Sequence, residues 1–263
     1  MRQGSMTVQP LQQVQEVSAV VTVENPEASG RFVICCEHAS NAFPAPWGEL
    51  GLTPAQMGAH IAWDPGALGL ARALAQLLDA PLVHAGVSRL IYDLNRPPQS
   101  RGAMAEQSEV HSIPGNIGLA ANERRARTEA VYLPFHAALR ALLARRAVAG
   151  PLPVLVTVHS FTPVWLGRPR AVEFGIIHDA DPRLARAVLA AAPTGLYARL
   201  NEPYSAADEV THTLALHATP MGLPSVMLEL RSDLIADAEA QRNVADRLAP
   251  SLRAALAAAE SEA

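Results

Sequence analysis

Polar side chains that could carry chemistry follow four apolar segments of the chain. A single histidine in such a place is more often a hydrogen-bonded structural residue, but four sets of side chains are a stronger signal. Ligand sites in open α/β sheets lie beyond the carboxyl ends of the strands. Imidazoles and carboxylates at such a site can bind a metal ion or transfer protons. The four sets are Glu37-His38, Asn95-Arg96, His159-Ser160 and Glu229.

Glu229 stands alone among apolar residues in the segment from Val226 to Leu230, within the run from Pro224 to Leu230. Burial of a carboxylate without a partner is costly, and loss of water raises its pKa. A carboxyl group with a raised pKa suits general base catalysis near neutral pH. The alternative is a buried ion pair with Arg231 or another arginine, and both interpretations stay open.

The elements that must position these side chains alternate between strands and helices. Helical periodicity predicts helices at Asp64 to Leu78, Leu119 to Ala147 with a kink at Pro134, Pro182 to Ala191, and Asp237 to Ala258. Short apolar runs predict strands at Arg31 to Cys36, Pro81 to His84, Val87 to Leu94, Val154 to Val158, Ala171 to Ile177, and Pro224 to Leu230. The alternation favours a mostly parallel sheet covered on both faces.

Length and patterning favour one domain. A chain of 263 residues can bury one sizeable core. We expect residues 1–25 to form a partly disordered N-terminal extension and residues 26–263 to form the domain. The polar segment from Arg101 to Gly118 is long enough to be a functional loop or lid.

Charge and composition exclude some partners. The net charge is −4, so no basic field is present to attract nucleic acid, although all 21 basic residues are arginine. The sequence has no apolar stretch long enough to cross a membrane, and Cys35 and Cys36 are adjacent and unsuited to pairing with each other. We therefore expect a cytoplasmic protein with neither nucleic acid nor membrane as partner. A homo-oligomer is compatible with the sequence.

Five segments together resemble the N-formylglutamate amidohydrolase family. The stretch from Ser88 to Pro97 is the most discriminating of them. The resemblance runs from about Arg31 to the final helix, and that family is similar in fold to zinc carboxypeptidases and aspartoacylases. It implies a single-domain three-layer α/β sandwich with a mostly parallel mixed sheet, and a catalytic zinc or another divalent metal. The segments are Cys36-Glu37-His38-Ala39-Ser40-Asn41, Trp63-Asp64-Pro65-Gly66, Ser88-Arg89-Leu90-Ile91-Tyr92-Asp93-Leu94-Asn95-Arg96-Pro97, Val158-His159-Ser160-Phe161 and Leu228-Glu229-Leu230.

A catalytic zinc takes three protein ligands and leaves one position open. His38 and His159 are the natural pair. The carboxypeptidase-like pattern has a glutamate three residues after the first histidine, where this chain has Asn41. We therefore predict Asp64, which matches an aspartate of the family motif, as third ligand, with Glu37 as the alternative. Asp64 could instead serve only as a helix N-cap.

The resemblance also implies roles around the metal. Glu229 falls where aspartoacylase-like enzymes place their catalytic glutamate, and Arg89 is expected to polarise the substrate carbonyl. Asn95 and Arg96 fall where a substrate carboxylate is held, and guanidinium groups match carboxylates with paired donors. Asp93 could orient an arginine, and a purely structural arginine-aspartate network is the alternative.

Three further residues are expected to bind substrate. Ser160 follows His159 directly, and His212 and His217 match histidines of the family. The function predicted is metal-dependent hydrolysis of the N-acyl, formyl-type amide of a small acidic amino-acid derivative such as N-formylglutamate. The alternatives are a carboxypeptidase-like peptidase or amidase, and a non-catalytic metal- or ligand-binding relative, which Asn41 keeps open.

Overall fold

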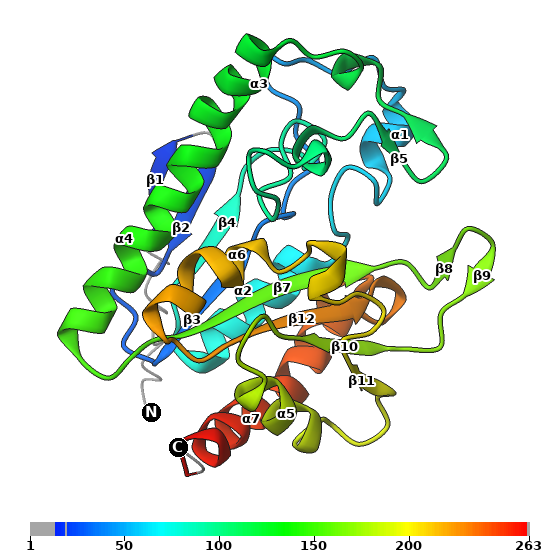
Figure 1. The fold of residues 1–263 in the computed structure, drawn as a ribbon. Coiled ribbons are helices and arrows are strands. Elements are labelled where there is room, and N and C mark those ends of the chain that lie inside the picture. Colours follow the sequence, from blue (N-terminus) through cyan, green and yellow to red (C-terminus); the bar gives the residue numbers. More distant parts are fainter. Residues whose placement is uncertain (1–13, 19, 262–263) are drawn as a thin grey trace, which may run out of the picture.

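A mixed sheet of eight strands forms the centre of the molecule (Figure 1). The computed structural model describes residues 14–18 and 20–261. The strand order is β1-β2-β4-β3-β7-β12-β10-β11. Parallel pairing joins β4, β3, β7 and β12 in the middle, and also β10 to β11. The strands are β1 (Val14–Ser18), β2 (Val21–Glu24), β3 (Phe32–Cys36), β4 (Leu82–Ala85), β7 (Val154–Phe161), β10 (Phe174–Ile177), β11 (Ala198–Leu200) and β12 (Ser225–Arg231).

Helices cover both faces of this sheet (Figure 1). One face packs against α2, α5 and α7, and the other against α4, α6 and long connecting segments. The helices are α1 (Pro54–Gly58), α2 (Ala67–Leu78), α3 (Ala121–Arg127), α4 (Leu133–Ala149), α5 (Arg183–Ala190), α6 (His212–His217) and α7 (Ala238–Ser261). The predicted class, an α/β fold with a mostly parallel mixed sheet, is confirmed.

The central strands are buried along their whole length, as strands covered on both faces must be. All eight residues of β7 and all five of β3 are buried. Both strands run in the same direction, so Glu37-His38 and His159-Ser160 emerge at the same edge of the sheet. The register aligns Glu229 of β12 with His159 of β7, which brings the third set of polar side chains beside them.

The predicted strand at Val87 to Leu94 is wrong. This segment is buried but forms turns, held by hydrogen bonds to loop backbone rather than to a neighbouring strand. The Ser88 hydroxyl donates to the Ala62 carbonyl at 2.7 Å, and the Asp93 amide donates to the Ala103 carbonyl at 2.8 Å. The Ser88 hydroxyl and the Asp93 carboxylate also accept from the Leu90 and Asn95 amides, and serine and aspartate side chains compete with ladder pairing in this way. The apolar composition of this segment therefore predicts its burial correctly but not its backbone conformation.

The predicted helix from Leu119 to Ala147 contains a π-helical turn at Thr128–Tyr132 between α3 and α4. Pro134 lies directly after this turn, in the first turn of α4. Proline has no amide hydrogen to donate, and a wider turn before it accommodates the missing bond. The kink predicted at Pro134 thus takes the form of a π turn.

The N-terminal part of the chain contributes to the sheet. β2 pairs antiparallel with β4, and β1 pairs antiparallel with β2, so the sheet begins before residue 26, where we expected the domain to start. Residues 1–13 of the expected extension lie outside the described residues.

The polar segment from Arg101 to Gly118 carries short elements, among them the hairpin of β5 (Gln107–Ser108) and β6 (His111–Ser112). A second hairpin joins β8 (Val164–Trp165) to β9 (Arg168–Pro169). Among the described residues, none of the helices combines the length and apolarity needed to cross a bilayer.

Candidate active site

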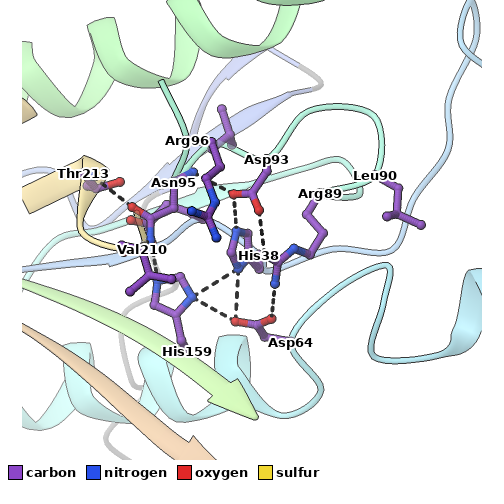
Figure 2. Close-up of polar contacts among 12 residues, drawn as sticks. His38, Asp64, Arg89, Leu90, Asp93, Asn95, Arg96, His159, Val210 and Thr213 are labelled. Carbon is purple, nitrogen blue, oxygen red and sulfur yellow. Dashed lines mark hydrogen bonds and ion pairs between the residues drawn. The ribbon is translucent and has the colours of Figure 1, made fainter. Parts of the chain in front are cut away.

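His38, Asp64 and His159 meet at the carboxyl edge of the central strands. Asp64 Oδ2 lies 3.2 Å from His38 Nδ1 and 2.9 Å from His159 Nδ1, and the two Nδ1 atoms are 3.2 Å apart. All three side chains are buried. Figure 2 shows them pointing toward one another from different parts of the chain. Two residues 121 positions apart in the sequence are thus neighbours around one point.

A carboxylate stands behind each of the two imidazoles. Asp93 Oδ1 accepts a hydrogen bond from His38 Nε2 at 2.8 Å, and Glu37 Oε2 is an ion-pair contact 3.2 Å from His159 Nε2. A carboxylate on Nε2 keeps the proton there and leaves the Nδ1 lone pair free to bind a metal. Glu37, our alternative third ligand, therefore lies on the side of His159 that faces away from Asp64.

The electrostatics of this cluster are those of charged groups in close contact. Burial alone would lower the pKa of His159, but the nearby carboxylates of Glu37 and Asp64 raise it well above its usual range. Burial would raise the pKa of Glu37, and the charge of His159 instead brings it to about 2. Burial would also raise the pKa of Asp64, but His38 and His159 lower it.

The three residues fit a divalent metal ion. Zinc bound at about 2.0 to 2.2 Å in a tetrahedral site separates its ligand atoms by about 3.3 Å, close to the distances found between the two Nδ1 atoms and Asp64 Oδ2. Two imidazole lone pairs facing each other repel unless a cation lies between them. These residues are also the group of potential ligands that comes together among the described residues. The fit favours Asp64 over Glu37 as the third potential donor.

Asn41 does not replace the missing glutamate of the carboxypeptidase-like pattern. Its side chain is exposed and donates to the Met57 carbonyl at 3.1 Å. Asp64, which precedes α2, supplies a carboxylate to the site from another part of the chain. The departure at Asn41 therefore does not leave the site short of a donor.

Glu229 lies beside the three potential ligands. It is buried, lines the same cavity, and among the described residues its Oε2 has no hydrogen-bond partner. Burial raises its pKa to about 7, and the neighbouring charges of His159 and Asp64 act on it in opposite directions. Arg231 pairs instead with Glu173 and Asp233. The ion-pair alternative with Arg231 is wrong.

Arg89 connects two carboxylates of the site. Its Nη2 donates to Asp93 Oδ2 at 2.6 Å and its Nη1 to Asp64 Oδ1 at 3.4 Å (Figure 2). The side chain is 29% exposed and lines the cavity, so part of its guanidinium still faces the space where a substrate would lie. Asp93 thus orients both an imidazole and an arginine, where the sequence had suggested only the arginine.

Asn95, Arg96 and Ser160 line the cavity, and the side chains of all three also bond backbone. Asn95 donates to the Val210 carbonyl and accepts from the Thr213 amide at 2.9 Å. The Ser160 hydroxyl donates to the Pro65 carbonyl at 2.8 Å. Arg96 donates to the Asp208 carbonyl and lies only loosely, at 3.8 Å, from a carboxylate of the exposed Glu209. Arg96 is the arginine of the site with the most freedom to bind an anion.

His212 and His217 lie outside the residues that line the cavity. His212 Nε2 is 2.8 Å from the Tyr132 hydroxyl, and His217 Nε2 is 2.9 Å from His136 Nδ1. The other nitrogen of His136 bonds the Leu94 carbonyl at 2.9 Å. We call His136, His212, His217 and Tyr132 the inner histidine cluster. The structure does not bring the two predicted substrate-binding histidines to the metal-binding residues.

The cavity has a volume of about 390 Å³ and includes residues that the sequence did not single out. Tyr204 lies in a loop between β11 and α6, and Trp165 lies in the β8–β9 hairpin. His60 Nε2 bonds Glu109 Oε1 at 2.7 Å and ties the segment after α1 to the polar segment from Arg101 to Gly118. That segment was predicted as a functional loop, but no pattern of spacing indicated its partner.

Comparisons with known proteins agree with this geometry. The family model described as N-formylglutamate amidohydrolase matches residues 30–236. The gene product Atu2144 from Agrobacterium tumefaciens has a similar structure, with 50% sequence identity and a TM-score of 0.90 over 92% of this chain and 96% of that chain. A search of curated proteins gives no significant match.

Two further structures are more distant. N-formylglutamate amidohydrolase from Ralstonia eutropha shares the fold at 19% identity and a TM-score of 0.68, over 93% of this chain and 100% of that chain. Succinylglutamate desuccinylase from Chromobacterium violaceum gives a TM-score of 0.42 at 14% identity, over 92% of this chain and 66% of that chain. The family model covers most of the chain and spans every residue placed in the site. This chain belongs to the N-formylglutamate amidohydrolase family.

Proposed function

We propose that this protein is a zinc-dependent hydrolase of the formyl-type N-acyl amide of a small amino-acid derivative that carries a carboxylate. Family membership supports hydrolysis of an N-formyl amide. N-formylglutamate is the reference compound, and another divalent ion could replace zinc, since the ligand preferences overlap. The observation that carries the proposal is the convergence of His38, Asp64 and His159 beside the unpartnered carboxylate of Glu229 in one cavity.

The residues of the chain divide the reaction between them. A bound zinc ion would polarise the amide carbonyl and make water a stronger acid. Glu229 takes a proton from the attacking water and passes it to the amide nitrogen as the carbon-nitrogen bond breaks. The products are the free carboxylic acid, formate for a formyl compound, and the amino acid with its amino group released.

Two arginines and two carboxylates hold the parts in place. Asp93 and Glu37 fix the imidazole rings of His38 and His159, so that both Nδ1 atoms face one point. Arg89 holds Asp64 and Asp93, and its remaining donors stabilise the negative charge that develops on the carbonyl oxygen. Arg96 binds the carboxylate of the substrate, since its contact with Glu209 is weak and its Nη1 bond goes to a backbone carbonyl, that of Asp208.

The test is an assay of formate release from N-formylglutamate and other N-formyl amino acids, paired with elemental analysis of the purified protein. We expect about one zinc or other divalent ion per chain, loss of activity with a chelator, and recovery when zinc is added. Glu229→Gln should lower kcat by about 10²- to 10⁴-fold and leave the metal content unchanged. Glu173→Gln is the matched control, because Glu173 is a carboxylate paired with Arg231 outside the cavity.

The competing functions give different results in the same assay. Cleavage of short peptides in preference to every N-formyl amino acid would identify a carboxypeptidase-like enzyme. Stoichiometric metal without hydrolysis of any N-acyl compound would identify a binding protein. Absence of bound metal from a fully active preparation would refute the role given to His38, Asp64 and His159.

A further inference from the structure

One wall of the cavity is aromatic. Phe161, Trp165 and Tyr204 come from the end of β7, the β8–β9 hairpin and the loop before α6, and all three line the cavity. Arg170 holds them together, because its guanidinium lies 5.4, 4.9 and 5.1 Å from the three ring centroids. Stacking of arginine on aromatic faces is a stable arrangement, so the three rings form one surface.

The rings, rather than the guanidinium, face the substrate space. Arg170 is half-buried and is not among the residues that line the cavity. Its Nη1 points toward the Thr162 carbonyl at 3.5 Å, and the Arg170 carbonyl accepts a hydrogen bond from Arg231. A ligand in the cavity would therefore contact the aromatic rings at this wall, and Arg170 would not be placed to bind a negatively charged group of the ligand.

Two arginines contribute permanent positive charge to the cavity wall, beside the histidines already described. The lining among the described residues contains Arg89 and Arg96, and the chain has no lysine. Arg89 already neutralises two aspartates, at 2.6 and 3.4 Å. Of the two, Arg96 has the weaker contact with a protein carboxylate, 3.8 Å from Glu209, so it is the arginine that can most readily pair one carboxylate of the substrate.

A second carboxylate would meet acidic groups instead. Glu109 and Asp208 also line the cavity. Glu109 is only 13% exposed and bonds His60, and the Asp208 carboxylate accepts from the Ser205 amide at 2.8 Å. Glu109 is largely buried, so its charge repels a nearby carboxylate more strongly than it would in bulk solution, whereas the exposed Asp208 repels it more weakly. The cavity therefore favours a substrate whose side chain is uncharged.

We propose that the substrate is an N-acyl amino acid with a single carboxylate and an aromatic or aliphatic side chain, which packs on the wall formed by Phe161, Trp165 and Tyr204. This inference rests on the proposed function and assigns Trp165 and Tyr204 as specificity-determining residues. It separates this chain from a preference for glutamate, whose side chain would bring a second carboxylate to the same cavity.

The first experiment measures kcat/KM of the zinc-loaded protein for four compounds: N-formyl-phenylalanine, N-formyl-leucine, N-formylglutamine and N-formylglutamate. We expect the phenylalanine and leucine compounds to exceed the glutamate compound by at least about tenfold, the range that one well-formed contact provides. Glutamine has nearly the size of glutamate but no charge, so its compound should rank between them. A higher kcat/KM for N-formylglutamate than for N-formylglutamine would overturn the inference, whereas no hydrolysis of any of the four would instead contradict the proposed function.

The second experiment tests the wall directly. Trp165→Ala should lower kcat/KM for N-formyl-phenylalanine by about tenfold and change it little for N-formyl-alanine, whose side chain is too short to reach the rings. Tyr197→Ala is the matched control, because Tyr197 is also an exposed aromatic ring stacked on an arginine, 4.2 Å from Arg199, but does not line the cavity. An equal loss for both substrates in Trp165→Ala would refute a role in specificity.

Arg170→Gln separates the aromatic wall from a hidden arginine contact. If the rings select the substrate, the ratio of kcat/KM between the phenylalanine and glutamate compounds stays the same or falls, because the rings lose their support. If Arg170 turned into the cavity to bind a second carboxylate, activity toward N-formylglutamate would fall selectively and this ratio would rise. The second result would show that the cavity reads a dicarboxylate.

Discussion

The molecule contains two groups of buried histidines that differ in what surrounds the rings. In the active site, His38 and His159 each contact two carboxylates, and the pKa of both is raised above its usual value despite burial. In the inner histidine cluster, His136 and His217 bond each other and a carbonyl, and burial lowers their pKa to about 3 and about 4.

The contrast shows that burial alone does not make a histidine functional. Both pairs have similar ring separations, 4.8 Å between the centroids of His38 and His159 and 5.1 Å between those of His136 and His217. Carboxylates decide the outcome, because they attract a cation or a proton between the rings. Without them the rings stay neutral and serve as packed hydrogen-bonding groups.

The largest difference should appear when one histidine of each group is removed. His159→Ala should abolish both stoichiometric metal binding and hydrolysis, because only two of the three donors remain. His136→Ala should keep about one metal per chain and lose stability instead. Elemental analysis and a thermal unfolding scan of both variants measure this, and loss of metal in His136→Ala alone would reverse our assignment of the two groups.

Removing a carboxylate behind a ligand should have a smaller effect. Glu37→Gln should weaken metal affinity by about 10- to 100-fold, since His159 then loses the group that fixes its ring. Glu24→Gln provides the control, because Glu24 is a buried carboxylate 3.0 Å from His84 Nε2 and lies outside the active site. Competition with a chelating dye measures both affinities, and equal values for the two variants would argue against a specific role for Glu37.

The pH dependence of activity should follow Glu229. Its pKa is raised to about 7 by burial, so the carboxylate that accepts a proton is lost as the pH falls through this value. A bound cation moves the midpoint lower, because it favours the charged form. The rate should then fall about tenfold per pH unit below the midpoint. An acid limb with the same midpoint in the residual activity of Glu229→Gln would contradict Glu229 as the base.

The smallest effect concerns stability at acid pH. His136 and His217 have pKa values in the folded state below the ordinary 6.5, so they remain neutral there while the unfolded chain takes up protons. Their contribution is fully present above pH 6.5 and is lost as the pH falls from 6.5 toward about 4. Urea unfolding at pH 7.5 and pH 5 should therefore show a smaller drop in free energy for the double variant His136→Gln/His217→Gln than for the unaltered protein. An equal drop in both proteins would mean that other groups carry the acid sensitivity.

The sequence predicts the parts of the site that depend on strand ends. His159 follows an apolar, β-branched run, and Glu229 interrupts another, so both their location and their isolation in apolar surroundings are visible without coordinates. The sheet register that places Glu229 opposite His159 then follows from parallel pairing of these two strands. These strands can be recognised from the sequence because a strand buried on both faces of a sheet needs a nearly continuous run of apolar residues.

The parts that the sequence does not reveal depend on side chains that bond distant backbone. The segment from Val87 to Leu94 has the composition of a strand, but the Ser88 hydroxyl bonds the Ala62 carbonyl and the Asp93 backbone amide bonds the Ala103 carbonyl, so the segment does not pair as a strand. Tyr204 has no helical or strand periodicity around it, so its arrival at the cavity could not be read from spacing. Asp93 has two partners at once: its Oδ2 accepts from Arg89, four residues away, while its Oδ1 accepts from the distant His38.

The π-helical turn at Thr128–Tyr132 changes which side of the continuous helix α3–α4 faces the core before and after it. A π turn holds about one residue more than an α turn, and each residue of an α-helix advances the chain by about 100° around the axis. Upstream of it, Arg127 reaches the Ile91 and Gly115 carbonyls, whereas downstream His136 reaches Leu94. The added rotation lets residues before and after the π turn both bond the segment from Val87 to Leu94, at the Ile91 and Leu94 carbonyls. Deleting one residue of this turn would rotate either Arg127 or His136 away from its carbonyl partner. The segment that carries Arg89, Asp93 and Asn95 would then lose one of its two attachments to the helix.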